Sequence, residues 1–203
     1  MEQEKKDFME ELSKSKVEHL PPLDESPMGK ANYFQINKIG DAIQDIPNPS
    51  RIRVLGSFDS GSIIAGYRAF LMDGKPIRAK KAESIDPDML GQNAFGQDEK
   101  PRQFWAFPVW NYHTGDVQIC ELHQKAVMRQ LKTWGEDPKW GDLRGYDLNV
   151  SKSGTGVKTV YSMNPIEIAP FPAEHQERAK IVLSVLKLDA LFSNGDPFEE
   201  VPQ

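Results

Sequence analysis

The chain has 203 residues, of which 38% are hydrophobic and 27% are charged, a composition typical of a soluble protein with a packed core. No apolar run approaches the ~20 residues that span a bilayer, and the charged start predicts that no signal peptide is present. A single cysteine excludes an intrachain disulfide and fits a reducing cytoplasm.

The net charge of -5 is distributed unevenly along the chain. Residues 1–29 carry 4 basic and 8 acidic residues, residues 30–163 carry 18 and 15, and residues 164–203 carry 3 and 7. A mildly basic body therefore lies between two acidic ends. Such ends either compete with an anionic ligand for the body or act only as soluble tails.

The first 49 residues contain few clear signals. Residues 1–29 offer one short helical face before Pro21-Pro22, and we expect a mobile acidic arm there. Residues 30–49 predict an edge strand or a short helix that leads into the body.

Two strands follow. Residues 51–55 alternate, with Ile52 and Val54 on one face. Residues 62–72 form a second, longer strand with Gly66 inside it, which predicts a bulge or strong coiling. Asp73-Gly74 is a turn signal.

Residues 74–100 lack a strand pattern but begin with a dense basic cluster. A connection of this length is often a binding loop or a lid, although a solvated loop is the alternative. Its basic residues are Lys75, Arg78, Lys80 and Lys81.

The most distinctive segment is 102–122, which predicts a hairpin with a turn around Gly115. Its first strand is aromatic at five positions: Phe104, Trp105, Phe107, Trp110 and Tyr112. Neighbouring strand residues point to opposite faces, so both faces are aromatic unless Pro108 marks a bulge. One face fills a core, and the other needs a cover of protein or ligand.

A helix and a second hairpin complete the body. Residues 122–134 have helical spacing, with Gly135 as a stop. Residues 146–163 predict two strands joined by a Ser-Gly-Thr-Gly turn, and no helix follows that would make the turn a phosphate loop.

These elements predict a mainly β fold: a five-stranded OB-type Greek-key barrel over residues 30–171, with one internal helix. Non-specific single-strand binders combine a basic track with aromatic faces. The basic candidates are Arg51, Arg53, Arg68, Lys75, Arg78, Lys80, Lys81, Arg102, Lys152 and Lys158. The aromatic candidates are Tyr67, Phe104, Trp105, Phe107, Trp110, Tyr112 and Tyr161.

Three segments, 74–78, 102–112 and 146–161, resemble phage and prophage single-stranded DNA-binding proteins, and the resemblance covers roughly residues 50–165. It implies an OB fold and a role in replication, recombination or repair in the cytoplasm of a bacterial host cell. T-even phage relatives carry a structural zinc. Here His113, Cys120 and His123 are the only possible cluster and fall short of four ligands, so we expect no metal and no cofactor.

The C-terminal part predicts an amphipathic helix over 172–193 that docks through Val182, Val185 and Leu186, followed by a mobile acidic tail over 194–203. The tip is similar to the protein-docking tails of bacterial and phage single-strand binders, although its Phe is not terminal. The implied docking residues for replication or recombination proteins are Asp196, Pro197, Phe198, Glu199 and Glu200. The alternative is an inert tail.

No catalytic set is present in the sequence, because the carboxylates do not cluster and Cys120 lies among apolar neighbours. The sequence therefore predicts a non-enzyme that binds single-stranded DNA without sequence preference. Two alternatives are a protein-interaction or virion module, whose aromatic strand would bury against another chain, and a metal-dependent nuclease. Both a monomer and a dimer are compatible with the sequence.

Overall fold

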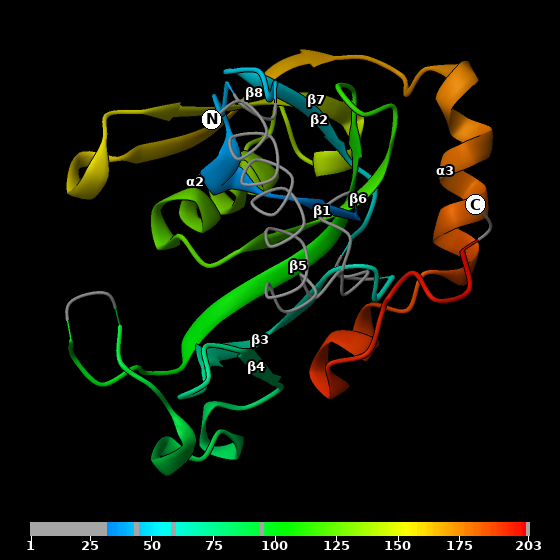
Figure 1. Cartoon of the computed structure of the whole chain (residues 1–203). Helices are drawn as coiled ribbons and strands as arrows, with labels where there is room; N and C mark the ends of the chain where they lie inside the picture. The colour runs from blue at the N-terminus through cyan, green and yellow to red at the C-terminus, as the bar shows by residue number, and fades with distance from the viewer. Residues whose placement is uncertain (1–31, 43–44, 58–59, 94–95, 202–203) are drawn as a thin grey trace, which may run out of the picture.

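Eight strands hydrogen-bond into a single mixed sheet (Figure 1). The computed structural model describes residues 32–42, 45–57, 60–93 and 96–201, and the arm expected over residues 1–29 lies outside them. The strands are β1 (Tyr33–Phe34), β2 (Ser50–Val54), β3 (Ile64–Phe70), β4 (Pro76–Ala79), β5 (Arg102–Asn111), β6 (Asp116–Leu122), β7 (Tyr146–Ser153) and β8 (Val160–Ile168).

The helical elements of the described residues are two α-helices and several short 3-10 turns. The α-helices are α2 (Lys125–Glu136) and α3 (Ala173–Val185). The 3-10 turns are η2 (Ile36–Lys38), η3 (Ala82–Ser84), η4 (Pro87–Met89), η5 (Leu143–Gly145), η6 (Gly156–Lys158) and η7 (Leu188–Ser193). The bounds of the α2 helix and of both hairpins agree within a few residues with those expected from the sequence.

β5 is the central strand of the sheet, whose main order is β1-β6-β5-β2-β7-β8. One edge of β5 pairs with β6, from Trp105 to Asn111. The other edge pairs with β2 along its C-terminal half and with β3 along its N-terminal half. β2 and β3 thus act as one long strand that is interrupted over residues 55–63.

Pro108 lies opposite this interruption, and it does not cause the bulge that the sequence suggested. The β5–β6 register continues unbroken through Pro108, which pairs with Ile119. The carbonyl of Pro108 accepts a hydrogen bond from the Leu55 amide at 3.0 Å. The backbone nitrogen of Pro108, which has no hydrogen to donate, is on the same side of the strand and faces the gap between β2 and β3. A proline is tolerated there because no strand requires its donor.

Two apolar cores lie on opposite faces of the sheet. The inner core lies between the sheet and α2 and includes Phe107, Leu122 and Leu131. The outer core lies between β5–β6 and the C-terminal section, and it includes Trp110 and Val182. Figure 1 accordingly shows α2 and α3 on opposite sides of the β5–β6 pair.

The sheet is not a closed barrel, which corrects the fold expected from the sequence. The edge of β6 that does not pair with β5 pairs with β1, which runs parallel to it. The edge of β8 is covered by α2: the Met163 amide donates to Gln130 Oε1 at 3.1 Å, and the Trp134 indole donates to the Met163 carbonyl at 3.0 Å. Side chains of a helix therefore satisfy the backbone groups that closure would have paired.

The C-terminal section also differs from expectation. The helix ends at Val185 rather than 193, and η7 follows after a break. Residues 194–201 fold back onto the sheet and do not extend from it as the sequence predicted, because Phe198 is only 9% exposed and packs in the outer core. The Lys187 amide donates to the Pro197 carbonyl at 3.0 Å, which fixes the fold-back. A single phenylalanine holds the tail in place because it buries its ring against the apolar outer face of β5–β6.

The basic segment after residue 74 is more ordered than its sequence suggested. Residues 76–79 form β4, which pairs with β3, and η3 and η4 follow it. Ile85 and Leu90 form a small third core with Ala69 of β3. Gly66 is required for close approach rather than for a bulge, because a Cβ there would lie 2.7 Å from both the Ala79 carbonyl and the Phe192 ring.

Candidate functional site

Three of the aromatic residues proposed to stack on bases are core residues. Phe104 and Trp110 lie on the outer face and are 0% and 2% exposed, and Phe107 lies on the inner face at 1%. The Trp110 ring stacks on His175 of α3, with 4.6 Å between ring centroids. Phe104 and Trp110 cannot reach a ligand unless the C-terminal section leaves the sheet, and Phe107 is enclosed in the core beneath α2.

Trp105 and Tyr67 are different, because both are partly exposed on the inner face of the β3–β5 pair. The register pairs Trp105 with Ala65 and Tyr67 with Gln103, so the two rings are diagonal neighbours on one face. Ala65 and Gln103 are exposed between them. We call these four residues the open face.

The open face is limited on its two sides by different parts of the chain. Trp105 packs against the inner core, and Tyr67 packs against the small core of the β3–β4 region. Each of the two rings is therefore fixed by packing on one side, while part of it remains accessible to solvent. A planar group could stack on them without any rearrangement of the sheet.

The two tyrosines proposed further along the chain are partly buried. The Tyr112 hydroxyl donates to Asp147 Oδ1 at 3.0 Å, and burial together with this carboxylate raises the pKa of Tyr112 to about 12. Tyr161 packs against the inner core. Both rings mainly fill structural positions.

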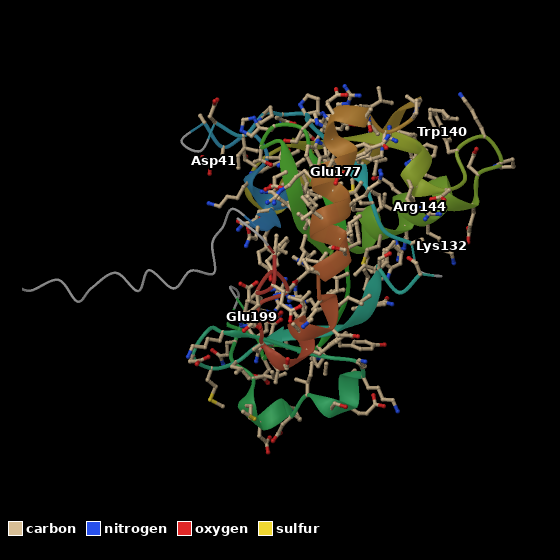
Figure 2. The ribbon with its side chains drawn as sticks, turned by 90° about the vertical axis from the view of Figure 1, so that its right-hand side faces the viewer. Asp41, Lys132, Trp140, Arg144, Glu177 and Glu199 are labelled. Atoms are coloured by element: carbon tan, nitrogen blue, oxygen red, sulfur yellow. The ribbon has the colours of Figure 1, made fainter. Side chains whose placement is uncertain are left out.

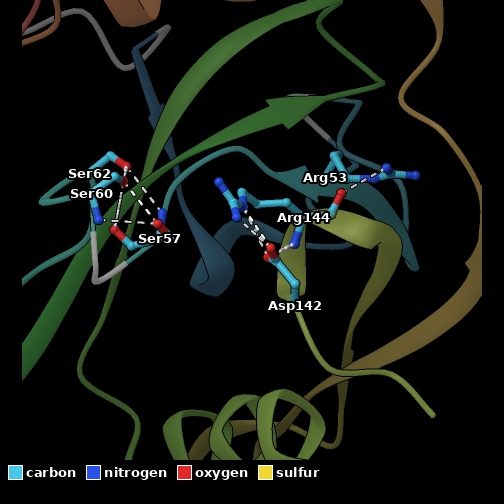
Figure 3. Close-up of polar contacts among 6 residues, drawn as sticks. All are labelled: Arg53, Ser57, Ser60, Ser62, Asp142 and Arg144. Carbon is cyan, nitrogen blue, oxygen red and sulfur yellow. Dashed lines mark hydrogen bonds and ion pairs between the residues drawn. The ribbon is translucent and has the colours of Figure 1, made fainter. Parts of the chain in front are cut away.

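Arg53 is a structural residue and not a phosphate contact. It is 1% exposed, its guanidinium pairs with Asp147, and it donates to the carbonyls of Arg144 at 3.1 Å and Ala169 at 3.0 Å. The Arg144 contact is drawn in Figure 3. Arg51 shares Asp147 and lies over the Tyr112 ring at 4.4 Å, but half of its side chain is exposed.

Arg68 and Arg78 are bound to the same carboxylate on the outer face. Arg78 Nη2 lies 2.8 Å from Glu121 Oε2, and Arg68 Nη1 lies 2.5 Å from Glu121 Oε1. All three side chains are largely buried, and burial lowers the pKa of Arg68. This cluster ties β3 and β4 to β6, and its guanidiniums are committed to Glu121.

The exposed lysines of the predicted track remain accessible. Lys75, Lys81 and Lys158 are exposed, and Lys75 has only a weak pair with Asp73 at 3.4 Å. Lys80 is exposed but lies 3.5 Å from Asp189 and 5.5 Å from the centroid of the Phe192 ring.

Two further basic candidates have partners in the fold. Arg102 is half exposed and lies 3.6 Å from Glu99. Lys152 donates to the Asn37 carbonyl at 3.1 Å. The predicted basic residues therefore have different roles: some remain exposed and some hold the fold together.

The residues of the predicted docking tail also fall into two groups, one buried and one exposed. Pro197 and Phe198 are buried, whereas Asp196, Glu199 and Glu200 are exposed. Glu200 pairs with Lys187. The acidic side chains are available to a partner protein, but the phenylalanine is not.

No group of three or more His, Cys, Asp or Glu side chains that could hold a metal lies within the described part of the chain. Burial raises the pKa of the Cys120 thiol, which opposes thiolate formation. Burial and the nearby Arg68 lower the pKa of His123. No helix among the described residues has the length and apolar character needed to cross a membrane.

A cavity of about 740 Å³ lies on the outer side, between the β2–β3 connection and the C-terminal section. Leu55, Ile64 and Leu188 provide apolar walls, and the hydroxyls of Ser60 and Ser62 lie at its rim. Figure 3 shows these serines linked with Ser57 by short hydrogen bonds. The hydroxyls thus satisfy one another.

Sequence reasoning missed Ala65 and Gln103, although strand periodicity already placed them beside Tyr67 and Trp105. Comparisons of the chain with protein-family models, with curated proteins and with solved structures found no match in any of the three.

Proposed function

We propose that the chain binds single-stranded DNA without sequence preference, in phage-type replication, recombination or repair. The observation that carries this proposal is the open face, where Tyr67 and Trp105 present adjacent rings on one side of two paired strands. Every base has a π face, so stacking on such rings tolerates any sequence.

Duplex DNA does not fit this surface. Its bases are already stacked on one another, and an aromatic side chain on a strand reaches only unstacked bases. Stacking contributes ~1–3 kcal/mol per base by alanine substitution. Two rings therefore supply enough binding energy for a marked preference for the single strand.

The connectivity supports the same proposal. Five strands follow the order β6-β5-β2-β7-β8, with α2 between β6 and β7. An OB-type barrel has this helix position and binds oligonucleotides on its second and third strands, which correspond here to β5 and β6. Two residues of the open face, Gln103 and Trp105, lie on β5.

The phosphate contacts of this proposal are five exposed cations of the predicted track: Lys75, Lys80, Lys81, Arg102 and Lys158. Arg53, Arg68 and Arg78 are left out because their guanidiniums are buried against carboxylates. Docking of replication or recombination proteins through the tail is proposed only for its exposed acids, Asp196, Glu199 and Glu200.

A salt titration with fluorescent dT and duplex oligomers tests the proposal. We expect strong, salt-sensitive binding of the single strand and much weaker binding of the duplex. Tyr67→Ala should weaken binding, whereas Phe70→Ala is a matched control. Phe70 is an aromatic residue of the same strand, 41% exposed, that points to the opposite face.

Equal effects of these two substitutions would contradict the open face as the binding site. An absence of single-strand binding would leave the alternative of a protein-interaction module. Cleavage of the oligomer with Mg²⁺ would instead identify a nuclease.

A further inference from the structure

The exposed side of α2 carries a row of cations that the sequence analysis did not consider. Lys125, Arg129 and Lys132 are all exposed. A helix turns about 100° per residue, so these positions fall within about 60° of one another. Of the buried residues of α2, Val127 and Leu131 lie on the other side of the helix, and Met128 borders the row next to Lys132.

We propose that this row is a phosphate track, along which the backbone of the single strand continues from the open face. The proposal rests on the proposed function and extends it. The alternative is a solvated helix surface with no ligand, and three observations argue against that alternative.

The first observation is the composition of α2. Its single acidic residue is Glu136, at the C-terminal end, where it lies 3.7 Å from Lys132. Lys125 and Arg129 make no ion pair with any described residue. On α3, by contrast, the charged residues Glu174, Glu177, Arg178 and Lys180 comprise two of each sign. A solvated helix usually mixes charges in this second way.

The second observation is the position of Lys125. It is the first residue of α2, next to the positive end of the helix dipole, and no side chain caps this end. A cation there is unfavourable by ~0.3–1 kcal/mol. The first turn also contains no acidic residue to offset it. A bound phosphate at this end would be stabilised by both the dipole and the lysine.

The third observation is proximity to the open face. Trp105 pairs with Leu122 at the end of β6, and α2 begins three residues later. The chain spans at most ~3.6 Å per residue, so the Lys125 and Leu122 Cα atoms lie within about 11 Å of each other. Figure 2 shows Lys132 at the side of the molecule, clear of α3. A strand that leaves Trp105 therefore meets Lys125 first, then Arg129 and Lys132.

A triple substitution, Lys125→Gln, Arg129→Gln and Lys132→Gln, tests the track. Its control is Lys38→Gln, Lys180→Gln and Lys187→Gln, which removes the same charge from η2, α3 and the residue preceding η7. We expect the α2 triple to reduce the slope of log K against log salt by roughly 2, at ~0.7 per phosphate on a single strand. The control should leave the slope nearly unchanged.

Oligomer length sharpens the test. A dT of ~4 nucleotides covers little beyond the open face and should bind both triples alike, whereas one of ~16 should separate them. Thermal unfolding provides the fold check, and Lys125→Gln alone should raise Tm slightly. A structural role for the lysine would predict a lower Tm.

The outcomes separate the two proposals. If wild-type protein binds dT and both triples show the same slope, the track is wrong and the proposed function remains. If wild-type protein does not bind dT, the proposed function is wrong and the row is a solvated surface.

Discussion

The two halves of β5 differ in how they use aromatic side chains, although Phe104 in the N-terminal half is buried like Phe107 and Trp110. In the C-terminal half, Phe107 packs against the inner core and Trp110 lies beneath the C-terminal section. In the N-terminal half, Trp105 packs against the inner core but stays partly exposed. An aromatic strand residue is thus available to a ligand only where no other element covers it.

The largest effect should come from the covered half. Phe107→Ala removes a ring that is 1% exposed, and we expect the free energy of unfolding to fall by ~3–5 kcal/mol in urea titrations. Trp105→Ala should cost much less stability. Comparable losses from the two substitutions would remove the distinction between the halves.

The buried arginine provides a test of similar size. Asp147→Asn would leave the buried guanidinium of Arg53 without its counter-charge, and breaking such a pair costs ~3–5 kcal/mol. Chemical denaturation should show this loss, and dT binding by the fraction that remains folded should be unchanged. Tighter binding with unchanged stability would restore Arg53 as a ligand contact, because its guanidinium would then be free to pair with phosphate.

The C-terminal cover should give an intermediate effect. Phe198→Ala removes a ring that is 9% exposed, and we expect a loss of ~2–4 kcal/mol in the free energy of unfolding. Glu199→Gln, at the adjacent exposed position, is the control and should be neutral. An unchanged Tm for Phe198→Ala would mean that the tail does not hold the sheet in solution.

The smallest effect concerns pH. The pKa of His123 is lowered in the folded state, so the unfolded chain binds a proton that the folded chain resists. Stability from this source is present above the ordinary pKa of ~6.5 and declines as the pH falls below it. His123→Asn should flatten stability against pH between about 7 and 5. An unchanged profile would show that His123 does not contribute.

Much of the fold could be predicted from local patterns. The aromatic hairpin, the α2 helix and the second hairpin follow from strand and helix periodicity with glycine turns. The open form of the sheet could not be predicted, because the β8 edge is covered by Gln130 and Trp134, which reach the backbone of Met163 across 29 residues or more. Such long-range hydrogen bonds leave no periodic signal.

The candidate site was predicted less well than the fold. Residue type identified Trp105 and Tyr67, but it equally selected Phe104, Phe107 and Trp110, which are buried. Alternation showed that both faces of β5 were aromatic. It could not show that Phe198 and α3 would cover one of them, because these contacts join segments more than 60 residues apart.

Nuclear magnetic resonance of the four tryptophan indole N–H groups during titration with dT compares the two halves of β5 directly. Variants with single tryptophan-to-phenylalanine substitutions assign the signals. The open face predicts that the Trp105 indole signal shifts on binding while the Trp110 signal, beneath α3, does not. A shift of Trp110 with Trp105 unchanged would contradict the open face as the DNA-binding surface.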